Sequence, residues 1–255
     1  MAFEYAGNMY GAAPFVLDRV QLAANCYVGQ LVRADTNAGG SIEPIANAAA
    51  GPDTTSYILG MVTAIRTSPT YDSTFQGDLG TYDTTQATQV ANDPVGPALA
   101  DITVIRPGDK IKAPIVNATI GTALDLQTVT TGSADGLTFV ANAITSSTSQ
   151  YSTSYCRTGA NRGQYRKVTT GNATTQTVLV GFTYDIAVGD TFVTAQCSMP
   201  GMPLHWDADS QFQAVDGDSA ISNYYRGTTL ELNLEESGRE FIVFTINPVH
   251  LAWTV

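Results

Sequence analysis

The chain contains two histidines, and an imidazole acts as a general base only when a nucleophile or an acid lies beside it. His205-Trp206-Asp207 brings an imidazole, an indole and a carboxylate together, and His250 lies near the end of the sequence. The sequence contains no Gly-x-Ser-x-Gly nucleophile motif, phosphate-binding loop or dinucleotide fingerprint. We therefore expect both histidines to be structural, and we expect no catalytic residue and no cofactor.

Four aspartates lie close together shortly after His205, and calcium requires several oxygen ligands of this kind. The spacing does not match an EF-hand loop, because Gln211 and Phe212 occupy the places of a ligand and of the glycine. We expect a solvated acidic turn and no metal site, although the sequence leaves cation binding here open. The four aspartates are Asp207, Asp209, Asp216 and Asp218.

A third of the basic residues gather in one short segment, since Arg157, Arg162, Arg166 and Lys167 are four of the chain's 12. Such a cluster creates a positive patch on an acidic protein and could steer it onto an acidic partner surface. The other interpretation is that the protein's own acidic residues neutralise the cluster. Both interpretations remain open from the sequence.

The composition excludes some function classes. Acidic residues outnumber basic ones 23 to 12, and the net charge of -11 argues against a nucleic-acid partner. No apolar run is long enough for a membrane helix, and we expect neither a secretory signal nor a membrane partner. Cys26, Cys156 and Cys197 are odd in number and far apart, which favours reduced thiols and folding in a reducing cytoplasm.

The hydrophobic pattern predicts an all-β fold, because short runs rich in Val, Ile, Thr, Tyr and Phe alternate with Gly, Pro, Asn and Asp. The nearly continuous apolar run Phe241–Ile246 should be buried on both faces. A Gly-Asp pair precedes a strand at Gly108-Asp109 and at Gly189-Asp190, which indicates a recurrent turn. The expected strands are Tyr27–Arg33, Ser56–Thr67, Ile102–Ile105, Lys110–Val116, Thr138–Ile144, Gln164–Thr169, Thr175–Thr183, Thr191–Ala195, Thr228–Leu234 and Glu240–Asn247.

Two segments lack a clear period. We expect residues 1–25 to be an extended arm that packs on a neighbouring subunit through aromatic anchors, with an edge strand of its own barrel as the alternative. The segment Arg66–Pro97 is poor in large aliphatic residues, and a neighbouring chain is expected to order it. The candidate partner contacts are Phe3, Tyr5, Tyr10, Phe15, Arg157, Arg162, Arg166 and Lys167.

The strand pair Tyr27-Val-Gly-Gln-Leu-Val-Arg33 and Tyr57-Ile-Leu-Gly-Met-Val-Thr63 resembles the small β-barrel of tailed-bacteriophage head decoration (capsid cement) proteins. The segments Cys156–Arg166 and Tyr184–Phe192 also look like recurrent phage structural-protein sequence. The resemblance implies a protein that sits on the assembled capsid and clamps neighbouring major capsid protein subunits. The chain is longer than compact decoration proteins, which suggests an inserted second β domain.

These observations lead to one overall prediction: a small β-barrel or sandwich with a second, inserted β subdomain and an extended N-terminal arm. We expect a virion structural protein on the capsid surface, assembled in the host cytoplasm, with the chain itself as a further partner in a homotrimer. The alternatives are a tail, head-fibre or connector-associated protein, or a carbohydrate-binding module that uses Trp206, Tyr224 and Tyr225. The expected parts are an arm (1–25), a barrel (26–120, with loop 66–97), a second β subdomain (121–198) and C-terminal strands (199–255).

Overall fold

The computed structural model describes residues 4–22, 28–34, 41–44, 57–66, 99–115, 124, 126–142, 152–172, 174–195, 199–204 and 227–252. These residues form strands and turns with no α-helix among them, which confirms the predicted all-β class. The chain divides into two compact units. The first comprises Met1–Lys112, Asp207–Gln211 and Thr245–Val255, and the second comprises Ala113–Trp206 and Phe212–Phe244. No helix in the described part has the length and apolar character needed to span a membrane.

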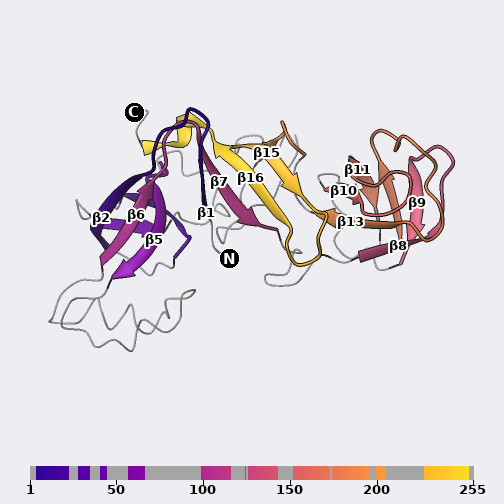
Figure 1. Cartoon of the computed structure of the whole chain (residues 1–255), viewed down its shortest axis with the longest axis horizontal. Helices are drawn as coiled ribbons and strands as arrows, with labels where there is room; N and C mark the ends of the chain where they lie inside the picture. The colour runs from indigo at the N-terminus through magenta and orange to yellow at the C-terminus, as the bar shows by residue number, and fades with distance from the viewer. Residues whose placement is uncertain are drawn as a thin grey trace. The chain divides into compact units, whose positions relative to one another are not determined.

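Five described strands of the first unit close into a barrel in the order β2-β4-β3-β5-β6 (Figure 1). They are β2 (Phe15–Leu22), β3 (Leu31–Ala34), β4 (Ser41–Pro44), β5 (Gly60–Arg66) and β6 (Leu99–Val104). Val, Ile and Ala side chains from four of these strands fill the interior, and each is at most 1% exposed: Val32, Ile42, Val62, Ala100 and Ile102. Burial of these apolar groups is the main force that closes so small a barrel.

Six described strands of the second unit close into another barrel, in the order β10-β11-β12-β9-β8-β13. They are β8 (Leu126–Thr131), β9 (Thr138–Ala141), β10 (Thr153–Cys156), β11 (Tyr165–Gly171), β12 (Thr175–Val178) and β13 (Thr191–Ala195). The ring of Phe192 stacks on Phe139 at 4.5 Å between centroids and meets Phe182 edge-on at 5.2 Å. This aromatic group anchors the apolar part of the interior.

A five-stranded sheet has the order β1-β7-β16-β15-β14. Its strands are β1 (Glu4–Asn8), β7 (Asp109–Pro114), β14 (Pro203–Leu204), β15 (Gly227–Asn233) and β16 (Phe241–Ile246), and the 3-10 turn Pro248–His250 follows β16. Figure 1 shows β16 between β7 and β15, so it is an inner strand. Ile242, Phe244 and Ile246 are buried on one face, and Val243 is buried on the other between the half-buried Phe241 and Thr245, which confirms the predicted burial fully for one face and in part for the other.

The two Gly-Asp pairs form the same turn. Gly108 and Gly189 have φ values of +83° and +93°, a region that glycine enters without strain. Asp109 Oδ2 accepts from the backbone N–H of Arg106 at 2.7 Å, and Asp190 Oδ2 accepts from that of Ala187 at 3.0 Å. Each aspartate therefore closes its own turn just before or at the start of a strand, which confirms the predicted turn chemistry.

All ten strands expected from the sequence coincide with strands of the structure, although several boundaries differ by a few residues. The expectation for the N-terminal residues needs correction. Residues 4–22 do not extend away from their own fold: β1 pairs antiparallel with β7, and β2 pairs with β6. The alternative of one edge strand on the chain's own barrel does not describe these residues either, because β1 is the edge strand of the five-stranded sheet and β2 is a member of the closed five-stranded barrel. Pairing with β7 and β6 satisfies the backbone groups that a free arm would leave to water or to a partner.

Candidate partner-binding surface

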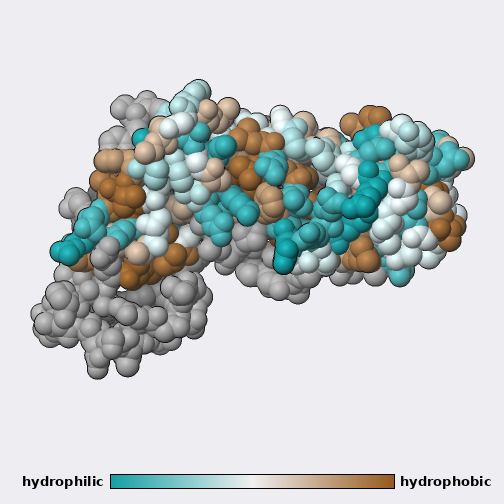
Figure 2. Space-filling model, viewed as in Figure 1, coloured by the Kyte–Doolittle hydropathy of each residue, from teal (hydrophilic) through white to brown (hydrophobic). Residues whose placement is uncertain are grey.

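Four exposed apolar side chains of the first unit lie at or beside the connection between β1 and β2, and Val249, in the turn after β16, is also exposed. We call residues 9–16, which are the linking residues together with the first two residues of β2, the β1–β2 connection. Met9, Tyr10, Phe15 and Val16 are 56%, 80%, 45% and 50% exposed, respectively. Figure 2 shows apolar surface, in brown, over the part of the molecule where Figure 1 places β2 and β5. Four large apolar side chains exposed within eight residues make this segment a candidate for a surface that contacts a partner.

The β1–β2 connection is held in place by the turn that precedes β7. The N–H of Met9 donates to the carbonyl of Gly108 at 2.8 Å, and the N–H of Tyr10 donates to Asn8 Oδ1 at 2.7 Å. The Tyr10 ring packs directly over Gly108, where a Cβ would lie 2.5 Å from ring atom Cε2. The guanidinium of Arg106 donates to the carbonyl of Ala13 at 2.5 Å. The exposed side chains therefore project from a fixed backbone, which lowers the entropic cost of binding.

The side chain of Asp109 connects residues of this region through hydrogen bonds. Its side chain is fully buried, and Oδ1 accepts from Asn8 Nδ2 at 2.6 Å and from the Tyr5 hydroxyl at 3.1 Å. Oδ2 accepts from the backbone and the Nε of Arg106. Burial, followed by the hydrogen bond to Asp109, raises the pKa of Tyr5 above its ordinary value. Tyr5 is thus bound to its own fold, whereas Tyr10 and Phe15 remain exposed, and Phe3 lies outside the described residues.

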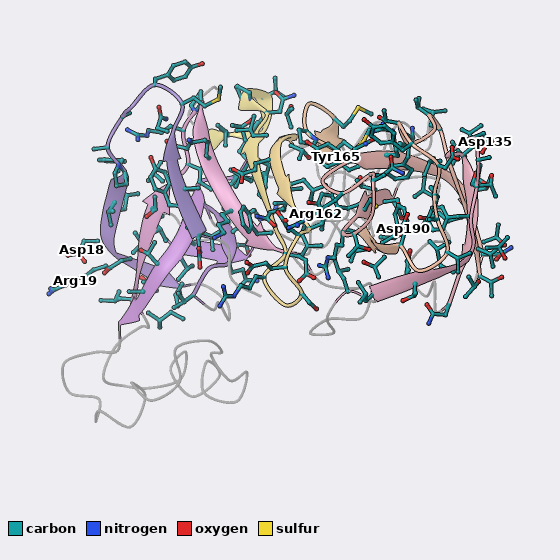
Figure 3. All side chains as sticks on the ribbon, turned by 45° about the vertical axis from the view of Figure 1, so that its right-hand side comes forward. Asp18, Arg19, Asp135, Arg162, Tyr165 and Asp190 are labelled. Atoms are coloured by element: carbon teal, nitrogen blue, oxygen red, sulfur yellow. The ribbon has the colours of Figure 1, made fainter. Side chains whose placement is uncertain are left out.

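A second exposed feature of β2 was not anticipated from the sequence. The pairing of β2 with β6 shifts between Leu17 and Val20, which marks a bulge at Asp18 and Arg19. Arg19 has a φ of 56°, and among the described residues it alone adopts a positive φ without being glycine. Its N–H donates to Asp101 Oδ1 at 3.1 Å. Figure 3 shows the side chains of Asp18 and Arg19 projecting outward from the strand.

The bulge places the exposed charged side chains of Asp18 and Arg19 on the same strand as the exposed apolar side chains of Phe15 and Val16. A left-handed conformation costs an ordinary residue about 1 kcal/mol or more, and such strain persists where the surrounding structure compensates for it. The buried carboxylate of Asp101 supplies that compensation here. Only a backbone dihedral identifies this feature, and no residue pattern in the sequence indicates it.

Two members of the predicted basic cluster are engaged within the chain. Arg157 is 9% exposed and pairs with Glu240 at 2.7 Å, and its Nε donates to the carbonyl of Leu234 at 2.7 Å. Arg162 is exposed and pairs with Glu235 at 2.5 Å. Both acceptor carboxylates belong to the turn between β15 and β16, beside which Figure 3 shows Arg162. The interpretation in which the protein's own acidic residues neutralise the cluster therefore holds for these two arginines.

The other two basic residues are placed differently. Arg166 donates to the carbonyl of Gly181 at 3.0 Å and to Gln164 Oε1 at 2.8 Å, and its guanidinium lies 5.2 Å from the centroid of the Phe182 ring. It therefore covers the aromatic core of the six-stranded barrel. Lys167 is half-buried on β11 and also interacts within the structure. Contact of any of the four with a partner remains a prediction.

Few of the other candidate sites fall within the described residues. Asp207, Asp209, Asp216, Asp218, His205, Trp206, Tyr224, Tyr225, Cys26, Cys197 and most of the 66–97 loop lie outside them. Among the described residues no group of three or more His, Cys, Asp and Glu side chains could hold a metal ion. Cys156 is buried, and burial, reinforced by the negative charge of Asp190, raises the pKa of its thiol to about 12. A protonated thiol of this kind is a poor nucleophile.

Comparisons with known proteins identify no family. No protein-family model matches the chain, and no curated protein does. Among solved structures, a chain from Mycobacterium phage Patience matches over 97% of both chains, with a TM-score of 0.32 and 15% sequence identity. Similarity at this level carries no argument about function, which must rest on the chain's own residues.

Proposed function

We propose that this chain is a virion structural protein of a tailed bacteriophage, a decoration protein that binds the outside of the assembled head. The observation that carries the proposal concerns the two segments that resemble decoration proteins. In the described part of these segments, β3 and β5 are paired strands of one small closed barrel, with Leu31 opposite Met61 and Val32 opposite Gly60. Sequence resemblance and barrel architecture thus coincide on the same residues.

The glycines of these two segments have structural roles in that barrel. Gly29 has a φ of +83° and donates its N–H to the carbonyl of Val62 at 2.7 Å. A Cβ at Gly60 would lie 2.5 Å from the carbonyl oxygen of Thr103 on β6. The resemblance therefore includes glycine positions that the barrel itself requires. A match at such constrained positions supports a shared architecture more strongly than a match of short runs at unconstrained positions does.

In this proposal the β1–β2 connection and the Asp18–Arg19 bulge contact the major capsid protein. Exposed aromatic side chains on a fixed backbone are effective interface anchors, because they bury a large area with few rotatable bonds. Arg19 adds a charged group that can fix the register of docking. Binding as a homotrimer belongs to the same proposal.

Co-sedimentation with purified heads that lack this protein tests the proposal. The full chain should pellet with heads at a saturating ratio, and the double variant Tyr10→Ser, Phe15→Ser should bind at least tenfold more weakly. A matched control replaces two exposed apolar residues of the six-stranded barrel, Leu179→Ser and Val180→Ser, and should bind like the parent. Arg162→Gln is a second control, because that side chain is already paired with Glu235.

The outcomes separate the alternatives. If the chain binds purified tails or connectors and not heads, it has another virion role, and the decoration assignment is wrong. If the Leu179→Ser, Val180→Ser variant loses binding while Tyr10→Ser, Phe15→Ser retains it, the contact surface lies on the other barrel. Analytical ultracentrifugation of the free chain and of the chain released from heads checks the trimer, and a monomer in both conditions contradicts it.

A further inference from the structure

The interior of the six-stranded barrel is divided into an apolar and a polar layer. The apolar layer contains Phe139, Cys156, Val178 and Phe192 among its buried residues. The polar layer consists of four side chains that are each 0% exposed: Gln127 on β8, Ser154 on β10, Gln176 on β12 and Thr194 on β13. A barrel interior of this size is ordinarily filled by apolar side chains, so four fully buried polar side chains from four of its strands require an explanation.

The strand register places these four side chains on the inner face. Thr194 lies directly opposite Ser154 and is two residues from the core residue Phe192. Phe192 lies opposite Gln127, and the core residue Phe139 lies opposite Gln176. Because residues opposite each other or two apart point to the same side of a strand, all four face the barrel interior.

Three of the side chains are joined by hydrogen bonds. Gln176 Nε2 donates to Thr194 Oγ1 at 2.8 Å, and the Thr194 hydroxyl donates to Gln127 Oε1 at 3.1 Å. Three buried polar atoms of the layer have no partner: Gln127 Nε2, Gln176 Oε1 and Ser154 Oγ. An unpaired buried polar group costs about 1 to 3 kcal/mol, so three together are a large cost for one small barrel.

The chemistry of these three atoms specifies what would satisfy them. Gln127 Nε2 is a donor, Gln176 Oε1 is an acceptor, and the Ser154 hydroxyl can do either. Exchanging the nitrogen and oxygen positions of both amides again leaves one donor and one acceptor. A bare cation needs several oxygen ligands and an anion needs several donors, so neither fits a neutral set with one of each. A molecule that accepts one hydrogen bond and donates two matches the donor and acceptor character of these three atoms.

We propose that the polar layer binds one buried water molecule, which accepts from Gln127 Nε2 and donates to Gln176 Oε1 and Ser154 Oγ. Three hydrogen bonds is the typical number for a buried water in a protein. The water connects β8, β10 and β12, none of which are neighbours in the barrel order. The water therefore links non-neighbouring strands through the barrel interior, in addition to the backbone hydrogen bonds between neighbouring strands.

The direct test is made on the full-length parent protein. Nuclear Overhauser spectroscopy should show a cross-peak between the side-chain amide protons of Gln127 and a water that resides longer than a nanosecond. A crystal structure at high resolution should place one ordered water within hydrogen-bond distance of Gln127, Gln176 and Ser154. Direct contact among these side chains, with no water between them and no cross-peak, overturns the proposal.

A variant pair provides the second test. Oxygen-17 relaxation dispersion counts long-lived internal waters, and the double variant Gln127→Leu, Gln176→Leu should contain one fewer than the parent. The matched control Ile186→Val alters the apolar layer of the same barrel at a residue that is not paired with any of the four polar side chains, and the count should not change because an apolar cavity stays dry. An unchanged count in the folded double variant contradicts the proposal. If that variant does not fold, the measurements on the parent decide.

Discussion

Arg157 and Glu240 form a buried ion pair, with 2.7 Å between Nη2 and Oε1 and side-chain exposures of 9% and 2%. The pair joins the residue after β10 to the residue before β16, and Arg157 Nε also donates to the carbonyl of Leu234. The backbone carbonyl of Glu240 in turn accepts from Ile115 at 2.9 Å. Arg157, which the sequence predicts to be a docking group, thus links the six-stranded barrel to the β15–β16 hairpin.

Replacing Arg157 with alanine should lower the free energy of unfolding by about 3 to 5 kcal/mol, because the Glu240 carboxylate would remain buried without its partner. Urea denaturation followed by circular dichroism measures this change. The matched control is Arg162→Ala, whose pair with Glu235 is exposed and should contribute little. Equal effects of the two substitutions would show that burial does not distinguish the pairs.

The stability of the first unit should fall at alkaline pH through Tyr5. Burial and the bond to Asp109 raise the pKa of Tyr5, so the folded state favours the neutral phenol. The stabilisation is complete below the unfolded pKa of 10.0 and is lost as the pH rises through the higher folded value. Unfolding free energies measured between about pH 8 and about pH 11 should therefore decline.

Burial also raises the pKa of Tyr155, so that residue contributes to the same pH dependence. The variant Tyr5→Phe isolates the contribution of Tyr5. It should be less stable than the parent by about 1 kcal/mol near neutral pH, the value of one hydrogen bond. Its stability should also decline less steeply above pH 10 than that of the parent. Parallel pH profiles for the two proteins would mean that the phenol of Tyr5 does not titrate differently on folding.

Substituting Gly60 with alanine should destabilise the five-stranded barrel by about 2 to 3 kcal/mol, since the new Cβ would meet a backbone oxygen of β6. That oxygen cannot move without disturbing the strand. Gly11→Ala is the comparison, because nothing lies within 4 Å of its Cβ position and only its φ of +75° is unfavourable. It should cost about 1 kcal/mol by thermal denaturation. A smaller loss for Gly60→Ala than for Gly11→Ala would contradict the close approach.

The Cys156 thiol should resist alkylation in the folded protein. With a pKa raised to about 12 by burial, it is protonated and inaccessible at about pH 8. Iodoacetamide labelling followed by peptide mass mapping should modify Cys156 only after denaturant is added. Complete labelling of Cys156 in the native protein, at the rate found in denaturant, would show that the six-stranded barrel opens readily.

Two of the strands that the sequence does not reveal have a shared physical character. Leu126–Thr131 and Thr153–Cys156 are rich in Thr, Ser and Gln, and they place Gln127 and Ser154 inside the barrel. Periodicity detects a strand by apolar residues on its buried face, so a strand with a polar inner face is missed. The strand Glu4–Asn8 was missed for a different reason: pairing with β7 and the bonds to Asp109 define it, and both come from residues about a hundred positions away.

The candidate contact residues also divide into those whose exposure agrees with the sequence-based prediction and those whose partners only the tertiary structure determines. The sequence predicts Tyr10 and Phe15 to be aromatic anchors; both are exposed, and their contact with a partner remains a prediction. The sequence could not determine that Tyr5 would be bound to Asp109 or that Arg157 would be buried against Glu240, because a side chain's partner depends on which strands become neighbours. The bulge at Arg19 depends on the register of β2 against β6, which is likewise a tertiary property.

The sequence by itself determined the all-β class, ten of the strands, the Gly-Asp turns and the burial of most of the run Phe241–Ile246. Each of these follows from local side-chain periodicity or from the conformational freedom of glycine, which act over a few residues. Only the tertiary structure decided that these strands close into two barrels and a sheet, and that two arginines of the basic cluster pair within the chain. Closure and ion pairing depend on contacts between residues far apart in sequence, and local patterns carry no information about those contacts.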